Sequence, residues 1–159
     1  GTNAVGSMVV FENGKPAKGE YRKFRVKTVV GANDLAMLKE VLSRRLAHVP
    51  NKSQIQNHKI NQKSFWPAPD LILVDGGQGQ VKAAEEALEA SHFKIPVLGL
   101  AKGFHRKNDY FVYGHNLSSI QRQDLLRLTK EYPYVFKHLR DEAHRFAVQY
   151  HRQRREKIV

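Results

Sequence analysis

The stretch DLILVDGGQGQ, residues 70–80, decides the fold. Leu71–Val74 form an apolar run that predicts a strand buried on both faces, and Asp75 ends it. Residues 81–88 carry apolar side chains at helical spacing, and Ile95–Leu100 form a second apolar run. A strand, a helix and a strand within about thirty residues predict a βαβ unit with parallel strands.

The carboxylate and the glycines at the end of the first strand have two interpretations. Asp75 either caps the next helix or holds a ligand that needs negative charge, because open α/β sheets bind ligands at the carboxyl ends of their strands. Gly76, Gly77 and Gly79 let a phosphate, a metal or another backbone approach closely. Their spacing fits neither the dinucleotide fingerprint nor the Walker phosphate loop. This motif alone leaves both interpretations open.

An antiparallel hairpin is predicted before the βαβ unit. Residues 6–30 contain two strand-like runs around the Asn13–Gly14 turn. The second run, Tyr21–Val30, carries lysine and arginine on both faces, which is typical of an edge strand. Residues 50–69 contain no acid and have proline at both ends, which predicts a mobile basic loop.

Helices and one more strand complete the predicted domain. Leucine and valine side chains keep helical spacing from Leu35 to Leu46, and residues 110–114 indicate a short strand. A closing helix is predicted from Pro133 to about Arg155, since proline suits a first helical turn. The sequence therefore predicts a single α/β domain over residues 1–159, with a mixed sheet flanked by helices.

The charge of the chain indicates a polyanionic partner. Its 27 Lys and Arg against 15 Asp and Glu give a net charge of +12, which favours nucleic acid over a membrane surface. The absence of cysteine excludes disulfides and thiolate metal sites, so a metal would be held by Asp, Glu or His, as Mg²⁺ and Mn²⁺ are. No apolar run is long enough for a membrane span, and we expect a cytoplasmic protein that binds no membrane.

The stretch RDEAHRFAVQYHRQRR, residues 140–155, is the second candidate for chemistry. His144 lies at the border of the helix's apolar face, where an imidazole either packs or acts as a ligand or proton acceptor. Arg145 and Arg152 belong either to a solvated face or to a phosphate-binding strip.

Further polar residues lie near the predicted strand ends. Lys102, Arg106 and Lys107 follow the second parallel strand, at the same sheet edge as Asp75, and either contact phosphate or form a solvated loop. Asp34 precedes a helix and fits an N-cap or first-turn acid.

Four segments in this order resemble the endonuclease domain of UvrC, the nuclease subunit of the bacterial UvrABC excision-repair system. They are SMVVFENGKPAKGEYRKFRVK (residues 7–27), DLILVDGGQGQ, PVLGLAKG (residues 96–103) and RDEAHRFAVQYHR (residues 140–152). The resemblance implies a ribonuclease-H-like fold and a divalent-metal-dependent cut in damaged double-stranded DNA, on the 5′ side of the lesion. It also implies UvrB bound at the lesion, and other domains of UvrC, as partners.

The resemblance carries catalytic roles onto three residues. The aspartate of the family's D-G-G motif is Asp75, the histidine of D-E-A-H-R-F is His144, and a further acid best fits Asp34 in GANDLAML. Asp75 and His144 would hold Mg²⁺ or Mn²⁺. The family's first aspartate lies in a central strand upstream of the segment that matches GTNAVGSMVVF. The resemblance thus predicts a domain truncated at its N-terminus, which binds DNA but cleaves it weakly or not at all.

Two other functions remain as alternatives. The first is a non-catalytic module that uses the same fold as a basic platform for DNA. The second is an enzyme acting on a nucleotide or phosphate metabolite through the glycine-rich turn, which leaves the charge of +12 unexplained.

Overall fold

The computed structural model describes residues 5–26, 34–50, 66–104 and 108–156, with the side chains of the last helix described up to Gln149. Its elements follow in chain order: β1 (Val5–Met8), β2 (Phe11–Glu12), β3 (Lys15–Pro16), a 3-10 turn (Lys18–Glu20), β4 (Arg22–Arg25), α1 (Asp34–Ala47), β5 (Ile72–Asp75), α3 (Gln78–Ala90), β6 (Val97–Ala101), β7 (Tyr110–Tyr113), α4 (Ser119–Glu131) and α5 (Pro133–Glu156).

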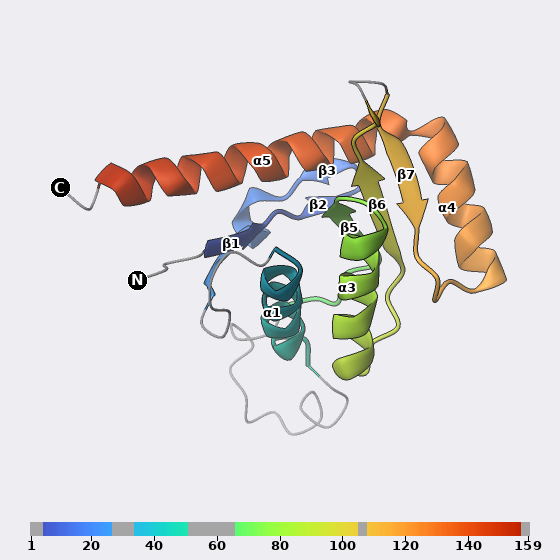
Figure 1. The fold of residues 1–159 in the computed structure, drawn as a ribbon, viewed down its shortest axis with the longest axis horizontal. Coiled ribbons are helices and arrows are strands. Elements are labelled where there is room, and N and C mark those ends of the chain that lie inside the picture. Colours follow the sequence, from blue (N-terminus) through green and yellow to red (C-terminus); the bar gives the residue numbers. More distant parts are fainter. Residues whose placement is uncertain (1–4, 27–33, 51–65, 105–107, 157–159) are drawn as a thin grey trace.

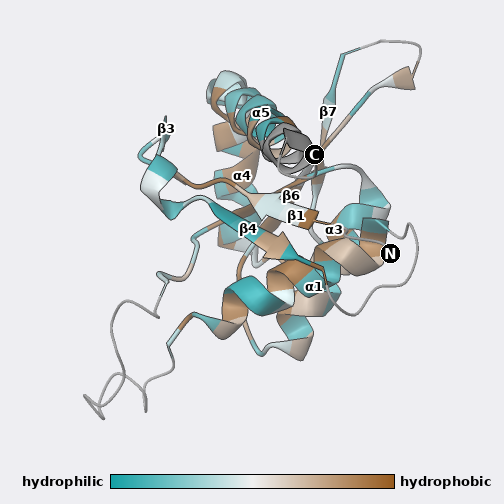
Figure 2. Ribbon diagram, turned by 90° about the vertical axis from the view of Figure 1, so that its left-hand side faces the viewer, coloured by the Kyte–Doolittle hydropathy of each residue, from teal (hydrophilic) through white to brown (hydrophobic). Residues whose placement is uncertain are grey.

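The elements form three layers. The strands lie in the middle, with α1 and α3 on one side and α5 on the other, and α4 flanks β7 (Figure 1). The view turned by 90° shows the same order, with α1 and α3 below the strands and α5 above them (Figure 2). This layering confirms the α/β class and the flanking helices. No helix in the described part of the chain is both long and apolar enough to cross a bilayer.

The central unit is the βαβ motif that the sequence predicts. β5 pairs with β6 in parallel, with Ile72 opposite Val97, and β7 adds an antiparallel neighbour to β6. Every residue of β6 is buried, and the methyl groups of Val81 on α3 pack against it with no exposed surface. The prediction that the first strand is buried on both faces is wrong. β5 is an edge strand of this ladder with only Val74 buried, because no described strand pairs with its other side.

The N-terminal hairpin is also confirmed. β1 pairs antiparallel with β4, and the shorter β2–β3 hairpin turns at Asn13 and Gly14, whose φ angles of 53° and 78° fit the Asn-Gly turn. Phe24 and Val26 point toward α1 and pack on Val41, forming a second small core. Residues 27–30 and 51–65, which include most of the predicted loop, lie outside the described residues.

The last helix connects the two main ladders. α5 contacts β1 of the hairpin ladder as well as β5 and β6 of the three-stranded ladder. It begins at Pro133, as predicted, and runs along the top of the molecule over the strands (Figure 1). The two ladders are thus held in one layer by packing against α5, without shared hydrogen bonds in the described part of the chain.

One helix, α4, was not predicted from the sequence. Its N-terminus is a capping box, in which Ser118 Oγ accepts from the Gln121 amide at 3.1 Å and Gln121 Oε1 accepts from the Ser118 amide at 3.0 Å. The Ser-x-x-Gln spacing at 118–121 is the local signal that would have identified it.

Candidate active site

Asp75 is the last residue of β5, and it does not cap the helix that follows. The N-cap of α3 is Gly77, whose amide donates to Oε1 of Gln80 at 3.1 Å. Gly76 has φ of +154°, and a Cβ there would lie 2.5 Å from the Gln80 side chain, so the turn requires glycine at this position. The Gln80 side chain thus accepts the hydrogen bond of the Gly77 amide at the start of α3. The carboxylate of Asp75 is not needed as a helix cap and is left for another role.

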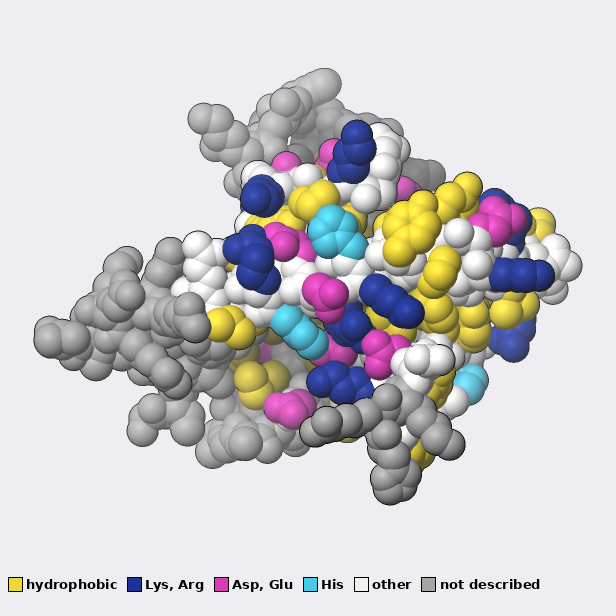
Figure 3. Space-filling model, turned by 90° about the horizontal axis from the view of Figure 1, so that it is seen from above, with side chains coloured by type: hydrophobic (Ala, Val, Ile, Leu, Met, Phe, Trp, Pro, Cys, Tyr) yellow, Lys and Arg dark blue, Asp and Glu magenta, His cyan; other side chains and the backbone are white. Residues whose placement is uncertain are grey.

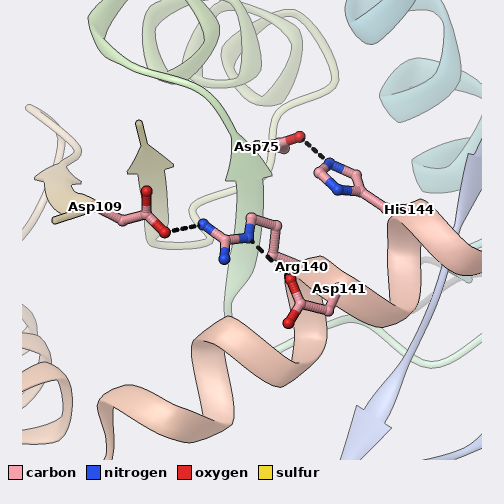
Figure 4. A network of polar contacts seen from close by, with 5 residues as sticks. All are labelled: Asp75, Asp109, Arg140, Asp141 and His144. Atoms are coloured by element: carbon pink, nitrogen blue, oxygen red, sulfur yellow. Dashed lines mark hydrogen bonds and ion pairs between the residues drawn. The ribbon is translucent and has the colours of Figure 1, made fainter. Parts of the chain in front are cut away.

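That carboxylate meets His144 from α5. Nε2 of His144 and Oδ2 of Asp75 are hydrogen-bonded, and the two side chains point toward each other from different layers (Figure 4). Their side chains are 48% and 45% exposed, so a ligand can reach both. An ionised carboxylate only accepts, so Nε2 donates to Asp75, and the other ring nitrogen of a neutral His144 keeps its lone pair. The pair thus offers a carboxylate oxygen and an imidazole nitrogen at the carboxyl end of a parallel strand.

Arg140, one helical turn before His144, fixes α5 against the sheet edge. Its guanidinium binds Asp109, which immediately precedes β7, and its Nε donates to Oδ1 of Asp141 at 3.3 Å (Figure 4). The hydrogen bond from Arg140 holds the pKa of Asp109 below its usual range, and the same bond raises the pKa of Arg140. The Arg140 side chain is only 13% exposed. This ion pair therefore anchors the helix segment that carries His144.

A second polar cluster anchors α5 to the hairpin. Glu142 is 8% exposed and accepts from Arg145 Nε at 2.9 Å, Arg145 Nη2 at 2.6 Å and the Tyr21 hydroxyl at 3.1 Å. Chiefly through Arg145, these bonds lower the pKa of Glu142 to about 2. Burial, reinforced by Glu142, raises the pKa of Tyr21 to about 12, so the phenol remains a donor at neutral pH.

We expect Glu142→Gln to lower the free energy of unfolding at neutral pH by about 2 kcal/mol, which is the usual contribution of a hydrogen bond to a charged group. Glu142 has a folded pKa of about 2 against an ordinary value of 4.5. Its stabilisation is therefore complete above the ordinary value and is lost as the pH falls toward the folded one. Urea unfolding from neutral pH down to about pH 2 should show a weaker acid dependence in the variant than in the parent. Glu131→Gln, which breaks an exposed pair with Arg127 on α4, is the control and should change little. Equal effects of the two substitutions would contradict the prediction.

Of the other acids and bases predicted for the site, the structure places three. Asp34 is the exposed first residue of α1, and its neighbour Leu35 packs near Gly79 in the first turn of α3. Lys102 is exposed directly after β6, close enough to Asp109 to help lower the pKa of that carboxyl. Arg145 is bound to Glu142 and donates to Gln149 at 3.0 Å.

The other residues predicted to contact DNA have side chains outside the part of the chain that the structure describes. Arg106 and Lys107 fall among residues 105–107, and Arg152 belongs to α5 but beyond its described side chains. Asp109, by contrast, is a site-edge residue that sequence reasoning missed. Its partner Arg140 is 31 residues away, so no local pattern connects the two.

The donor set fits a hard divalent cation in part. The carboxylate oxygen of Asp75 is the kind of ligand that Mg²⁺ and Mn²⁺ prefer, whereas the imidazole nitrogen of His144 is more typical of softer transition metals. Within the described ranges, no three His, Asp or Glu side chains come together to hold a metal, so Asp34 does not join Asp75 and His144 in one cluster. Asp75 and His144 therefore offer two side chains that could hold such a cation.

Comparison with known proteins identifies the family of this chain. Residues 1–148 match the family model of the UvrC RNase H endonuclease domain. A "UvrABC system protein C" of Clostridium beijerinckii is 42% identical over 160 residues, which cover 99% of this chain and 25% of that protein. Proteins of the same name from Streptococcus equi subsp. equi and Dehalococcoides mccartyi are 41% and 43% identical, over 99% of this chain and 24% of theirs. The chain thus spans about a quarter of the length of the curated relatives it matches.

Proposed function

The chain belongs to the family of UvrC RNase H endonuclease domains, and from this premise we propose that the Asp75–His144 pair is the catalytic centre of a divalent-metal-dependent DNA endonuclease. The reaction is hydrolysis of a phosphodiester in damaged double-stranded DNA, on the 5′ side of the lesion, as part of nucleotide excision repair in the cytoplasm. The observation that supports this most directly is the contact itself. It joins an aspartate at the end of a strand and a histidine 69 residues later on another layer.

In this proposal Asp75 and His144 bind Mg²⁺ or Mn²⁺, which when bound polarises the phosphoryl oxygen and lowers the pKa of water. Asp75 orients the imidazole through its hydrogen bond with Nε2. Where His144 acts on water directly, its other ring nitrogen accepts the proton of the attacking water. Asp34, at the start of α1, is the proposed further acid by resemblance alone, since it does not cluster with Asp75 and His144 in the described structure.

Positive side chains around the pair would neutralise the DNA backbone. Lys102 is exposed at the same sheet edge, and we propose Arg106, Lys107 and Arg152 as further DNA contacts from the sequence alone. Arg145 contributes less charge than the others, because Glu142 already accepts two of its hydrogen bonds. We infer that UvrB bound at the lesion, together with other domains of UvrC, brings the damaged strand to this site.

The test is nicking of supercoiled plasmid by this chain in Mn²⁺. We expect slow nicking that EDTA abolishes, since the described residues provide only two metal ligands. A longer chain that includes the relatives' sequence upstream of Gly1 should nick faster, because the resemblance places another aspartate and strand there. Nicking that persists in EDTA would overturn the metal-dependent mechanism.

A non-catalytic DNA-binding module is the second candidate, favoured by the net charge of +12 and the two-ligand site. It predicts salt-dependent DNA binding that Lys and Arg substitutions weaken, with no effect of metal or of Asp75→Asn. Absence of nicking in every metal, for both this chain and the longer one, would support it.

A further inference from the structure

A groove separates α5 from the hairpin on the far side of the helix from His144. It has a volume of about 410 Å³, and its walls come from the 3-10 turn, the start of β4 and the middle of α5. Six residues line it: Lys18, Tyr21, Lys23, Arg145, Phe146 and Gln149. Phe146 follows His144 by two positions, about 200° around the helix, so the groove and the Asp75–His144 pair lie on different sides of α5.

The groove is positively charged. Lys18 and Lys23 are exposed at its rim. The adjoining acid, Glu142, is buried and already accepts bonds from Arg145 and Tyr21. Of the side chains that line the groove, Lys18, Lys23 and Arg145 are basic and none is acidic. The face seen from above carries Lys and Arg side chains interspersed with acids and histidines (Figure 3). The lysines at the groove thus make a local cationic site within a mixed surface.

Aromatic rings form the rest of the wall. The rings of Tyr21 and Phe146 meet edge to face with centroids 5.1 Å apart. The ammonium of Lys23 lies 5.4 Å from the centre of the Phe146 ring. The bond from the Tyr21 hydroxyl to Glu142 holds the tyrosine in place. Both rings are half-buried and keep exposed surface. Fixed aromatic rings beside lysines are the pattern by which proteins bind single-stranded nucleic acid, with bases stacked on rings and phosphates on cations.

We propose that this groove binds an unpaired nucleotide of single-stranded DNA, with its base against Tyr21 and Phe146 and its phosphates on Lys18 and Lys23. From the proposed function the inference takes only that the ligand is DNA. A strand held here passes around α5 to reach His144, a path of about 16–19 Å, which is half the circumference of a helix 10–12 Å in diameter. Duplex DNA is disfavoured in the groove because its bases are stacked and offer no free face to the rings.

The test measures binding by fluorescence anisotropy in EDTA, so that no cleavage intervenes. The probes are a fluorescein-labelled oligothymidylate of about 12 nucleotides, within the usual range of single-strand sites, and a hairpin duplex of similar length. The double substitution Lys18→Ala with Lys23→Ala should weaken binding of the single strand about five- to tenfold at about 0.1 M salt. The slope of log affinity against log salt concentration should become shallower by about 1.4, because each lost phosphate contact on a single strand accounts for about 0.7.

The matched control removes the same net charge elsewhere. Lys82 on α3 and Lys130 on α4 are both exposed. Replacing both with alanine should change the affinity for the single strand less than about twofold, which is less than the loss of one phosphate contact would cause. Equal losses in the two double variants would overturn the inference, because net charge alone would then explain binding. A loss of duplex binding as large as that of single-strand binding would overturn it as well.

A second variant tests the rings. Phe146→Leu keeps an apolar side chain against Tyr21 and should weaken single-strand binding about tenfold, with the same thermal unfolding as the parent. Unchanged binding would overturn the stacking role. The proposed function fails separately, when neither His144→Ala nor EDTA alters cleavage. The groove inference fails when the lysine and Phe146 variants bind the single strand as the parent does.

Discussion

Replacing His144 with alanine is expected to lower the rate of metal-dependent plasmid nicking at least a hundredfold, the usual scale for loss of a general acid–base group. The substitution removes the imidazole that the proposal uses as a metal ligand or as the proton acceptor, and it leaves Asp75 without its partner. DNA binding should remain within about twofold, because the proposal assigns no phosphate contact to His144.

The matched control is His138→Ala. His138 is an exposed histidine on the same helix that packs edge to face with Phe11 at 4.9 Å, away from the catalytic pair. This variant should nick DNA like the parent, and Asp75→Asn should behave like His144→Ala. Nicking by His144→Ala at the parental rate would remove the pair from the mechanism. A simultaneous loss of DNA binding would instead make the histidine a binding residue.

Replacing Gly99 with alanine is expected to destabilise the domain by about 3 kcal/mol, the upper range for overpacking a core. Gly99 lies in the middle of β6, and a Cβ there would be 2.6 Å from the carbonyl oxygen of Gly76 and 2.7 Å from a methyl group of Val81. Neither neighbour can move freely, because Gly76 is in the tight turn after Asp75 and Val81 has no exposed surface. The backbone at Asp75 should shift as well, so nicking should fall beyond what the loss of stability explains.

Two other glycines provide controls for Gly99→Ala. A Cβ at Gly19 would meet nothing within 4 Å, and one at Gly77 would make an ordinary contact of 3.8 Å with Ala101. Alanine at either position should change the unfolding free energy by less than about 1 kcal/mol in urea titrations. Parental stability of Gly99→Ala would show that β5 and β6 can separate at the turn without cost.

The centre of the fold was predictable because its signals are local. Two apolar runs flanking a helical repeat define the βαβ unit, and Asn13–Gly14 and Pro133 mark a turn and a helix start by their own backbone preferences. The edge position of β5 was not predictable, because an apolar run looks the same whether a second strand covers it or a helix does.

The site was predictable only where a residue's type restricts its role. At Asp75 the sequence left a cap and a ligand site open, and the structure decides against the cap because Gln80 satisfies the amide of Gly77. The bonds of Arg140 to Asp109 and of Tyr21 to Glu142 join residues 31 and 121 positions apart. Such pairs depend on how the layers pack, which no local pattern encodes.

The position of α5 ties the activity of the domain to a single docking equilibrium. The helix that carries His144 also joins the two ladders, and Arg140 and Glu142, both just before the histidine in the chain, fasten it to Asp109 and to Tyr21. Opening of this helix separates His144 from Asp75 while β5, α3 and β6 keep their own hydrogen bonds and core. The fraction of molecules competent for catalysis is therefore the fraction with α5 docked, a quantity smaller than the fraction that is folded.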